Sequence, residues 1–178
     1  MNAKSRGVFS KLPLAWQEDA PWEHSARVEY FEALGYFVFS VQRAARIIVP
    51  RYEATPEVRR ALAEDREYFW LDCVIEIDLD ELAAVFRASF IPPDFRECYR
   101  ELQHAIDQRS GHASFHPLEA GLTFDLAYEQ GKAVLKARAR SLQSLHYSLS
   151  FELECTEYDL RQMVRDLHQI LHYYQHLR

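Results

Sequence analysis

The 178-residue sequence has few glycines, only three cysteines and no long uninterrupted run of apolar residues. Glycine occurs five times, and the signatures that depend on it are missing: a phosphate-binding loop, a dinucleotide fingerprint and the G-x-S-x-G nucleophile turn. The zinc signature H-E-x-x-H is missing as well. These absences exclude the enzyme classes that such motifs mark. A small enzyme with an unrecognised site stays open as an alternative.

The cysteines and the apolar stretches indicate where the protein works. Cys73, Cys98 and Cys155 are odd in number, widely spaced and surrounded by apolar residues, which predicts buried thiols in a reducing compartment and offers no zinc motif. The opening "MNAKSRGVFSKLPLAW" has no apolar run of the secretory kind. The apolar stretch at residues 28–49 carries glutamates and arginines that a membrane span would not tolerate. We expect a cytoplasmic protein with no membrane contact and no cofactor.

Charge is unevenly distributed along the chain. Residues 1–66 hold 10 Lys+Arg against 9 Asp+Glu, a net charge of +1, whereas residues 67–178 hold 11 against 18, a net charge of −7. The acidic second part disfavours nucleic acid as a partner and favours a basic protein. The same division separates a predicted N-terminal arm and helical extension, residues 1–66, from a predicted α+β domain, residues 67–178.

Two interpretations of the segment before Pro50 are open. Apolar residues from Val28 to Ile48 recur at helical spacing, and Pro50 would end that helix. The run "YFVFSV" within it is rich in β-formers, which favours a strand. After this segment, "TPEVRRALAEDREYF" predicts a short helix, because Thr55 stands just before a proline of the first turn.

From Leu71 onward the hydrophobic period becomes two, which predicts strands. A helix at "PPDFRECYRELQHAIDQRSG" separates two strands from four others, and a final helix begins at "TEYD" with a capping-box-like pattern. The predicted strands are "LDCVIEIDLDEL", "LAAVFRASFI", "HASFHPL", "GLTFDLAYE", "AVLKARARSL" and "HYSLSFELEC". The predicted fold class is α+β, with one largely antiparallel sheet of about six strands and two helices on one face.

Strand register follows from requiring apolar residues to share a face. A two-residue turn at residues 130–131 places Asp125 opposite Lys136. A loop at residues 143–145 then places Lys136 opposite Glu152. Both predicted pairings bring the apolar faces of neighbouring strands together.

This register puts a basic ladder, Lys136, Arg138 and Arg140, in a middle strand. Its neighbours there are acidic or hydroxyl side chains. Cross-strand pairing on a solvated sheet face therefore explains the ladder better than nucleic-acid binding does.

The histidines do not predict a metal site. His168, His172 and His176 recur every four residues of the final helix, but their direction rotates from the edge of its apolar stripe into solvent. Convergent ligands are what a metal ion needs. His112 and His116 share one strand face, yet residues four apart on a strand are separated by about 13 Å.

Solubility alone does not explain one acidic surface. Asp72, Glu76, Asp78 and Asp80 lie on the polar face of "LDCVIEIDLDEL", with like charges about 7 Å apart along the strand. Arginines of a neighbouring strand, such as Arg87, could balance them. Alternatively, these four residues are a partner-binding face for a basic protein.

The second part of the chain resembles a known family. The segments "CVIEIDLDELAAVFRASFIPPDFRECYRELQHAI", "ASFHPLEAGLTFDLAYEQGKAVLKARARSL" and "HYSLSFELECTEYDLRQMVRDLHQIL" are similar to the WapI-type family, over about residues 70–175. Members are small bacterial proteins regarded as immunity proteins of polymorphic toxin systems. The resemblance implies a non-enzymatic protein that blocks a toxin.

The leading hypothesis is thus a binding protein, an immunity protein that neutralises a cognate, basic toxin domain by occlusion. A scaffold protein is the alternative, forming a homo-oligomer through an aromatic N-terminal segment. That segment contains Phe31, Tyr36, Phe37 and Phe39.

Overall fold

The computed structural model describes residues 33–42, 44–56, 58–60, 69–79, 82–140 and 148–176. The chain divides into two compact units, Met1–Tyr30 and Phe31–Arg178, and all described residues belong to the second. What was expected of residues 1–32 lies outside the described residues.

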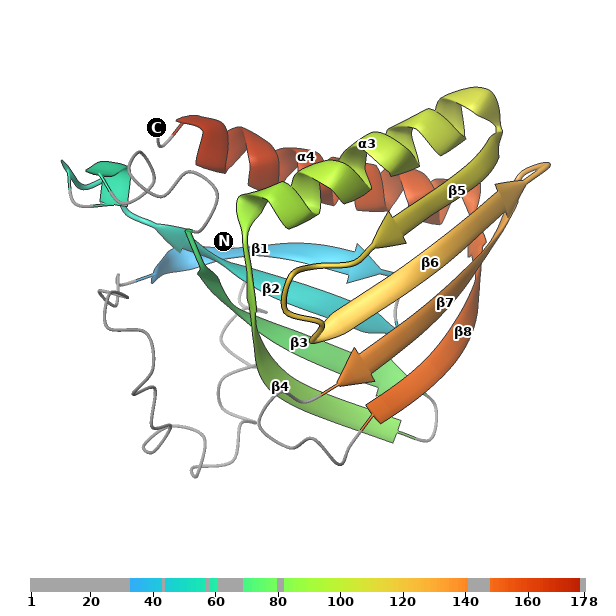
Figure 1. The fold of residues 1–178 in the computed structure, drawn as a ribbon, viewed down its shortest axis with the longest axis horizontal. Helices are drawn as coiled ribbons and strands as arrows, with labels where there is room; N and C mark the ends of the chain where they lie inside the picture. Colours follow the sequence, from blue (N-terminus) through green and yellow to red (C-terminus); the bar gives the residue numbers. More distant parts are fainter. Residues whose placement is uncertain are drawn as a thin grey trace, which may run out of the picture. The chain divides into compact units, whose positions relative to one another are not determined.

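The described strands form two four-stranded antiparallel sheets (Figure 1). The first contains β1 (Ala33–Val41), β2 (Ala45–Tyr52), β3 (Leu71–Leu79) and β4 (Leu82–Phe90). The second contains β5 (Ser110–Phe115), β6 (Leu122–Glu129), β7 (Lys132–Arg140) and β8 (Ser148–Thr156). Helix α3 (Pro92–Gln108) connects the sheets, and α4 (Glu157–His176) follows β8.

The α+β class is confirmed, but a single sheet of about six strands is wrong. Each sheet is a meander in which strands neighbouring in sequence are neighbours in space. The predicted strands were assigned to one sheet, whereas α3 separates them into two and β1 and β2 complete the first. Sequence periodicity shows that a strand exists but not which sheet it joins.

The helical interpretation of the segment before Pro50 is wrong within the described residues, and the strand interpretation is right. Residues 47–50 of β2 are all buried, and such a strand has no alternation of buried and exposed residues. Pro50 lies inside β2, opposite Tyr36 of β1. The pairing of β2 with β3 stops at Ile48, so this proline falls where β2 is paired on one side only.

The predicted helix starts agree with the capping contacts. The hydroxyl of Thr55 accepts a hydrogen bond from the Val58 N–H at 3.2 Å, and residues 58–60 are helical. At the start of α3, the Asp94 carboxylate accepts from the Ile91 N–H at 2.9 Å. Two prolines occupy the first turn of α3, where their missing N–H groups leave no helical bond unmade.

The predicted hairpin registers are confirmed. Asp125 lies opposite Lys136, and Lys136 lies opposite Glu152. Gln130 and Gly131 connect β6 to β7 with φ angles of 52° and 84°, as a two-residue turn of the mirror-image type requires.

An aromatic cluster joins the inner faces of the two sheets. The Phe115 ring lies 5.6 Å from Phe124, 5.5 Å from Phe90 and 6.0 Å from Phe39, measured between ring centroids. These residues come from β5, β6, β4 and β1, and all are buried. Burial of this much aromatic surface is the main force that holds one sheet against the other.

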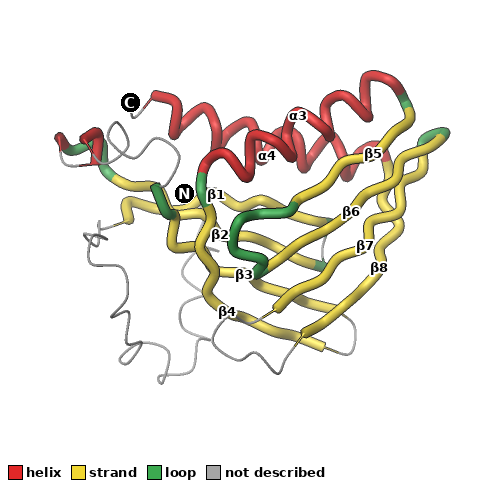
Figure 2. The backbone as a smooth tube through the Cα atoms, viewed as in Figure 1, coloured by secondary structure: helices red, strands yellow, loops and turns green. Residues whose placement is uncertain are grey.

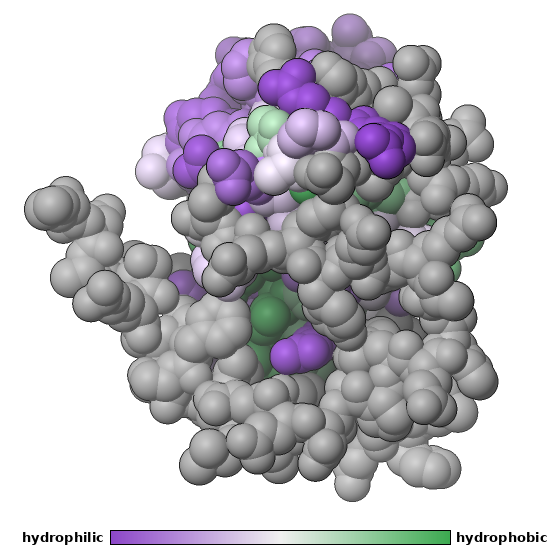
Figure 3. Space-filling model, turned by 90° about the vertical axis from the view of Figure 1, so that its left-hand side faces the viewer, coloured by the Kyte–Doolittle hydropathy of each residue, from purple (hydrophilic) through white to green (hydrophobic). Residues whose placement is uncertain are grey.

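The two helices pack against each other across the same side of both sheets (Figure 2). Helix α3 packs on β5, and α4 packs on β1 and β8. The hydroxyls of Tyr173 and Tyr174 donate to the carbonyls of Tyr52 and Pro50, which fixes the end of α4 on β2. Hydrophilic side chains gather along the upper part of the face in Figure 3, where Figure 1 places the helices.

All three cysteines are buried and free, as predicted. Burial raises the pKa of the Cys73 and Cys98 thiols well above the usual value, and raises the pKa of Cys155 to about 12. Thiols with such pKa values stay protonated and unreactive near neutral pH.

Candidate functional site: an acidic groove at the end of β3

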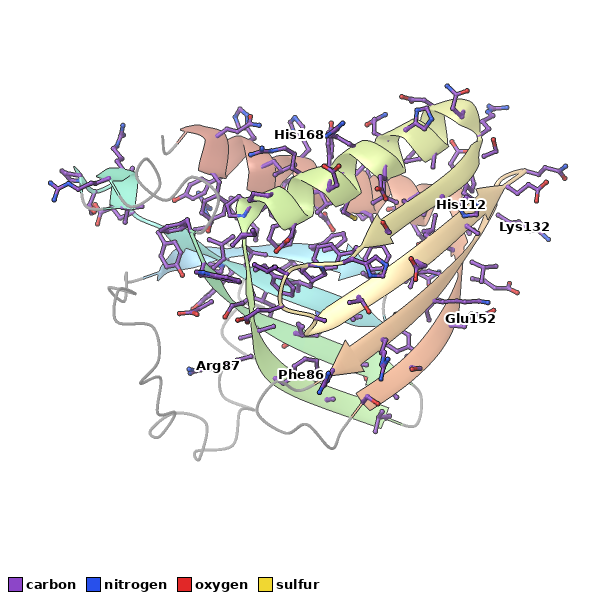
Figure 4. The ribbon with its side chains drawn as sticks, viewed as in Figure 1. Phe86, Arg87, His112, Lys132, Glu152 and His168 are labelled. Atoms are coloured by element: carbon purple, nitrogen blue, oxygen red, sulfur yellow. The ribbon has the colours of Figure 1, made fainter. Side chains whose placement is uncertain are left out.

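The predicted acidic residues do not form one continuous surface. Asp72, Glu76 and Asp78 share the outward face of β3, and Asp80 lies outside the described residues. Asp72 and Asp78 lie near opposite ends of the strand, about 20 Å apart at 3.3 Å per residue. Figure 4 illustrates the same alternation on β4, where Phe86 and Arg87 project from opposite faces.

Glu76 is mostly buried, with 10% of its side chain exposed. It pairs across strands with Arg46 of β2, whose guanidinium Nη2 lies 2.8 Å from Glu76 Oε2. The atoms are in contact as an ion pair without the angles of a hydrogen bond. Glu76 is therefore part of the first sheet's own structure rather than a charge offered to a partner.

Asp72 lies in a setting that resists ionisation. Partial burial raises the pKa of its carboxyl, and the nearby Arg87 opposes that shift. The expectation that Arg87 balances the acidic strand thus applies to Asp72, whereas Arg46 balances Glu76.

Asp78, by contrast, opens onto a groove of about 690 Å³. The groove lies where the ends of β1 and β3 and the start of β2 approach β8 and the first turns of α4. No lysine or arginine is among its described lining residues. They are Ser40, Gln42, Ala44, Asp78, Leu79, Leu153, Tyr158, Asp159 and Gln162.

Asp159 is held at the groove by the start of α4. Its Oδ2 accepts from the Thr156 N–H at 2.8 Å and from the Thr156 hydroxyl at 2.7 Å. In return, the Asp159 N–H donates to the Thr156 hydroxyl at 3.3 Å. This confirms the predicted capping box, in which the shorter Asp replaces Glu. The carboxylate is also favoured there by the helix dipole.

A third carboxylate, which does not line the groove, is bonded to two residues that do. Asp166 of α4 accepts from the Ser40 N–H at 3.0 Å and from the Gln162 amide at 2.7 Å. Burial raises the pKa of Asp166, and these two hydrogen bonds oppose that shift. Opposite, the Gln42 amide donates to the Glu154 carbonyl. The walls of the groove are therefore fixed by hydrogen bonds before any partner arrives.

Tyr158 forms the exposed rim, with 69% of the residue accessible and the Arg165 guanidinium 5.8 Å from the centre of its ring. Carboxylates, amides and an exposed ring suit the side chains of lysine and arginine, which need acceptors and stack on aromatic faces. The arrangement can bind cations of a protein partner.

The histidines show no arrangement typical of a metal centre. His168 and His172 are exposed on α4, with stacked rings 5.9 Å apart, and His168 projects away from the sheets (Figure 4). The side chain of His176 is not described. Among the described residues no three His, Cys, Asp or Glu side chains are grouped as metal ligands would be.

The aromatic segment considered for oligomerisation is largely internal. Phe39 is fully buried, and Phe37 lies 5.2 Å from the Tyr173 ring and 5.0 Å from the Arg51 guanidinium. Tyr36 is 43% exposed, and Phe31 is outside the described residues.

Sequence reasoning found Asp78 but missed its neighbours in the groove. Gln42, Asp78 and Asp159 are far apart in sequence and meet only because the two sheets turn toward each other. The capping pattern at Thr156 was a usable signal for the position of Asp159, but not for what lies beside it. None of the described helices is long and apolar enough to cross a membrane.

Comparison with known proteins gives one family match. The immunity protein WapI-like family matches residues 46–175, which begins in β2 and ends in α4. No curated protein matches the chain.

Among solved structures, a match is found to a chain from "Crystal structures of trypanosoma bruciei MRP1/MRP2", from Trypanosoma brucei. The two share 13% identity over 92% of this chain and 95% of that one, with a TM-score of 0.39.

Proposed function

Because this chain belongs to the immunity protein WapI-like family, we propose that it binds a protein toxin and blocks it by occlusion. On this proposal the protein has no catalytic task, and its partner is a basic toxin domain. The supporting observation is the groove at Asp78, which has two carboxylates and no lysine or arginine among its described lining residues.

Electrostatic attraction explains how such a groove would work. Exposed acidic groups speed the encounter with a cationic partner, because the field acts over roughly 8 Å at physiological ionic strength. An exposed aromatic residue next to them, Tyr158, then supplies buried contact area, which slows dissociation. Asp78 sets the association rate and Tyr158 the lifetime of the complex.

The test looks for a basic toxin domain encoded beside this gene and uses it as the partner. Co-expression of the wild-type protein should restore growth of cells that make the toxin. Asp78→Lys should slow association about tenfold at low salt and much less at high salt. Tyr158→Ala should mainly raise the dissociation rate.

Asp107→Lys is the matched control, since it makes the same charge change on an exposed part of α3. If Asp107→Lys and Asp78→Lys slow association equally, the effect reflects net charge and the groove is not the docking site. No protection by the wild-type chain would overturn the immunity function itself.

A further inference from the structure

The four edge strands of the two sheets differ in what lies against their free backbone groups. On β1, the Ser40 N–H donates to Asp166 of α4, and on β5 the Ser114 N–H donates to Glu101 of α3 at 2.7 Å. Gly121 packs on the inner face of the first sheet, where an added Cβ would lie 2.8 Å from the Cβ of Ala88 on β4 and 3.4 Å from the Ile75 side chain on β3. Helix side chains therefore bind edge N–H groups of β1 and β5.

Strand β8 is an open edge as far as Leu153; the next carbonyl, that of Glu154, already accepts from the Gln42 amide of the first sheet. Within the described residues it pairs with β7 alone, along all nine of its positions. Its inward residues Leu149, Phe151 and Leu153 are only half-buried, although their counterparts on β7 are buried. An unpaired strand with accessible apolar side chains is a template for another strand.

The β7 ladder also lacks partners on this side. Lys136 lies 3.9 Å from Glu152, but Arg138 and Arg140 have no described carboxylate within ion-pair distance. Their neighbours on β8 are Ser150 and Ser148, whose hydroxyls are short and uncharged. The expected cross-strand pairing thus holds for Lys136, while the described residues offer the other two guanidinium groups no carboxylate.

We propose that β8 pairs antiparallel with β8 of a second copy of this chain, about a twofold axis at Phe151. The sequence "SLSFELE" of residues 148–154 is self-complementary about that residue. Ser150 then faces Glu152 of the second copy, Ser148 faces Glu154, and Leu149 faces Leu153. Like charges never face each other, and the phenylalanines meet at the centre, which favours this register.

The same register supplies the missing carboxylates. Arg138, Ser150 and Glu152 of the second copy fall on one row across the seam, and Arg140, Ser148 and Glu154 on the next. Two strand spacings separate the ends of each row, about 10 Å between Cα atoms. Arginine and glutamate can span this distance over a serine. Glu152 and Lys132 project from the second sheet in Figure 4.

The mass of the full chain in solution tests the pairing. One copy weighs 21.0 kDa, so the dimer weighs 2 × 21.0 = 42.0 kDa, which light scattering or sedimentation can resolve. Ser150→Glu places like charges opposite each other twice and should weaken the dimer at least about tenfold. Ala127→Glu, on the exposed face of β6 away from the edge, is the control and should not change the mass.

A cysteine scan tests the register. Phe151→Cys should form a covalent dimer under oxidation, since residue 151 faces itself and the three native thiols are buried. Leu149→Cys should not, because residue 149 faces residue 153. A monomeric mass at every concentration, an unaffected dimer in Ser150→Glu, or crosslinking through residue 149 in place of 151 would each overturn the proposal.

Discussion

The two sheets use the same cross-strand charge pairing with different consequences. In the first, Arg46 faces Glu76 at 2.8 Å, and the glutamate side chain is 10% exposed. In the second, Lys136 faces Glu152 at 3.9 Å, and both side chains are well over half exposed.

The strand register determines which charged side chains face each other, but their burial determines how much the pair contributes to stability. A glutamate removed from water depends on its arginine, whereas an exposed pair is screened by solvent and salt. An acidic strand can therefore look like a docking face in sequence while its central carboxylate serves the sheet. The following experiments test this difference.

The largest effect is expected for Glu76→Lys. The new cation would be buried against Arg46, so the free energy of unfolding should fall by about 3 kcal/mol. Glu152→Lys, facing Lys136 in the open, should change it by no more than about 0.5 kcal/mol. Urea unfolding of both variants measures the difference, and equal losses would refute the distinction between the sheets.

The next largest loss of stability is expected at Glu101, whose carboxylate binds the β5 edge of the second sheet. Glu101 accepts from both the N–H and the hydroxyl of Ser114, at 2.7 and 2.8 Å. Glu101→Ala should cost about 1–2 kcal/mol, because a partly buried N–H loses its acceptor. Glu97→Ala removes an exposed ion pair with Arg100 from the same helix and should cost less than about 0.5 kcal/mol. Thermal unfolding that ranks Glu97→Ala above Glu101→Ala would contradict this.

On the first sheet, Asp166 binds the edge N–H of Ser40 in the same way, and it should make the free energy of unfolding depend on pH. Burial raises the pKa of Asp166 in the folded protein, so between the usual value of 3.8 and the raised value the folded state holds a proton that the unfolded state releases. This contribution to the free energy of unfolding is present at lower pH and is lost as pH rises through the raised pKa.

Asp166→Asn has no such proton and keeps an oxygen for the Ser40 N–H. The difference in unfolding free energy between wild type and Asp166→Asn should therefore change with pH above 4, to the disadvantage of wild type. Urea unfolding at several pH values measures it. A constant difference across that range would show that Asp166 does not titrate differently on folding.

The smallest effect concerns the exposed pair itself. A double-mutant cycle with Lys136→Ala and Glu152→Ala should give a coupling energy of about 0.2–0.5 kcal/mol that disappears in high salt. Coupling well above 1 kcal/mol would mean that Glu152 is not solvated in solution, and then the dimer seam becomes the first place to look.

Much of the second sheet could be predicted from sequence because its strands are joined by short turns. The alternation in β6, β7 and β8 fixed which residues face one another, and a Gln-Gly turn fixed where pairing begins. Local rules suffice when the paired strands follow each other directly in the sequence. The stripes of α3 and α4 were predictable for the same reason.

The first sheet was harder because β2 pairs with β3 across a long connection and β2 is buried on both faces along part of its length. Ile47, Ile48 and Val49 form a continuous apolar run, from which a strand and a buried helix cannot be distinguished. Nothing local indicates that Arg46 faces Glu76, thirty residues later. The groove depends on this packing, so only one of its two carboxylates was predicted as a binding residue.

The meander order has a consequence for how the chain matures. Each sheet is one continuous stretch, so a ribosome releases the whole of the first sheet before β5 is made. Until then, Phe39 and Phe90 have no Phe115 or Phe124 to cover them. The Ser40 N–H is without its acceptor for longer still, because Asp166 is 126 residues downstream. The nascent first sheet thus has an unpaired edge strand and an exposed apolar face. Chaperones that bind such surfaces should bind chains halted near residue 108 in preference to chains that already include α4.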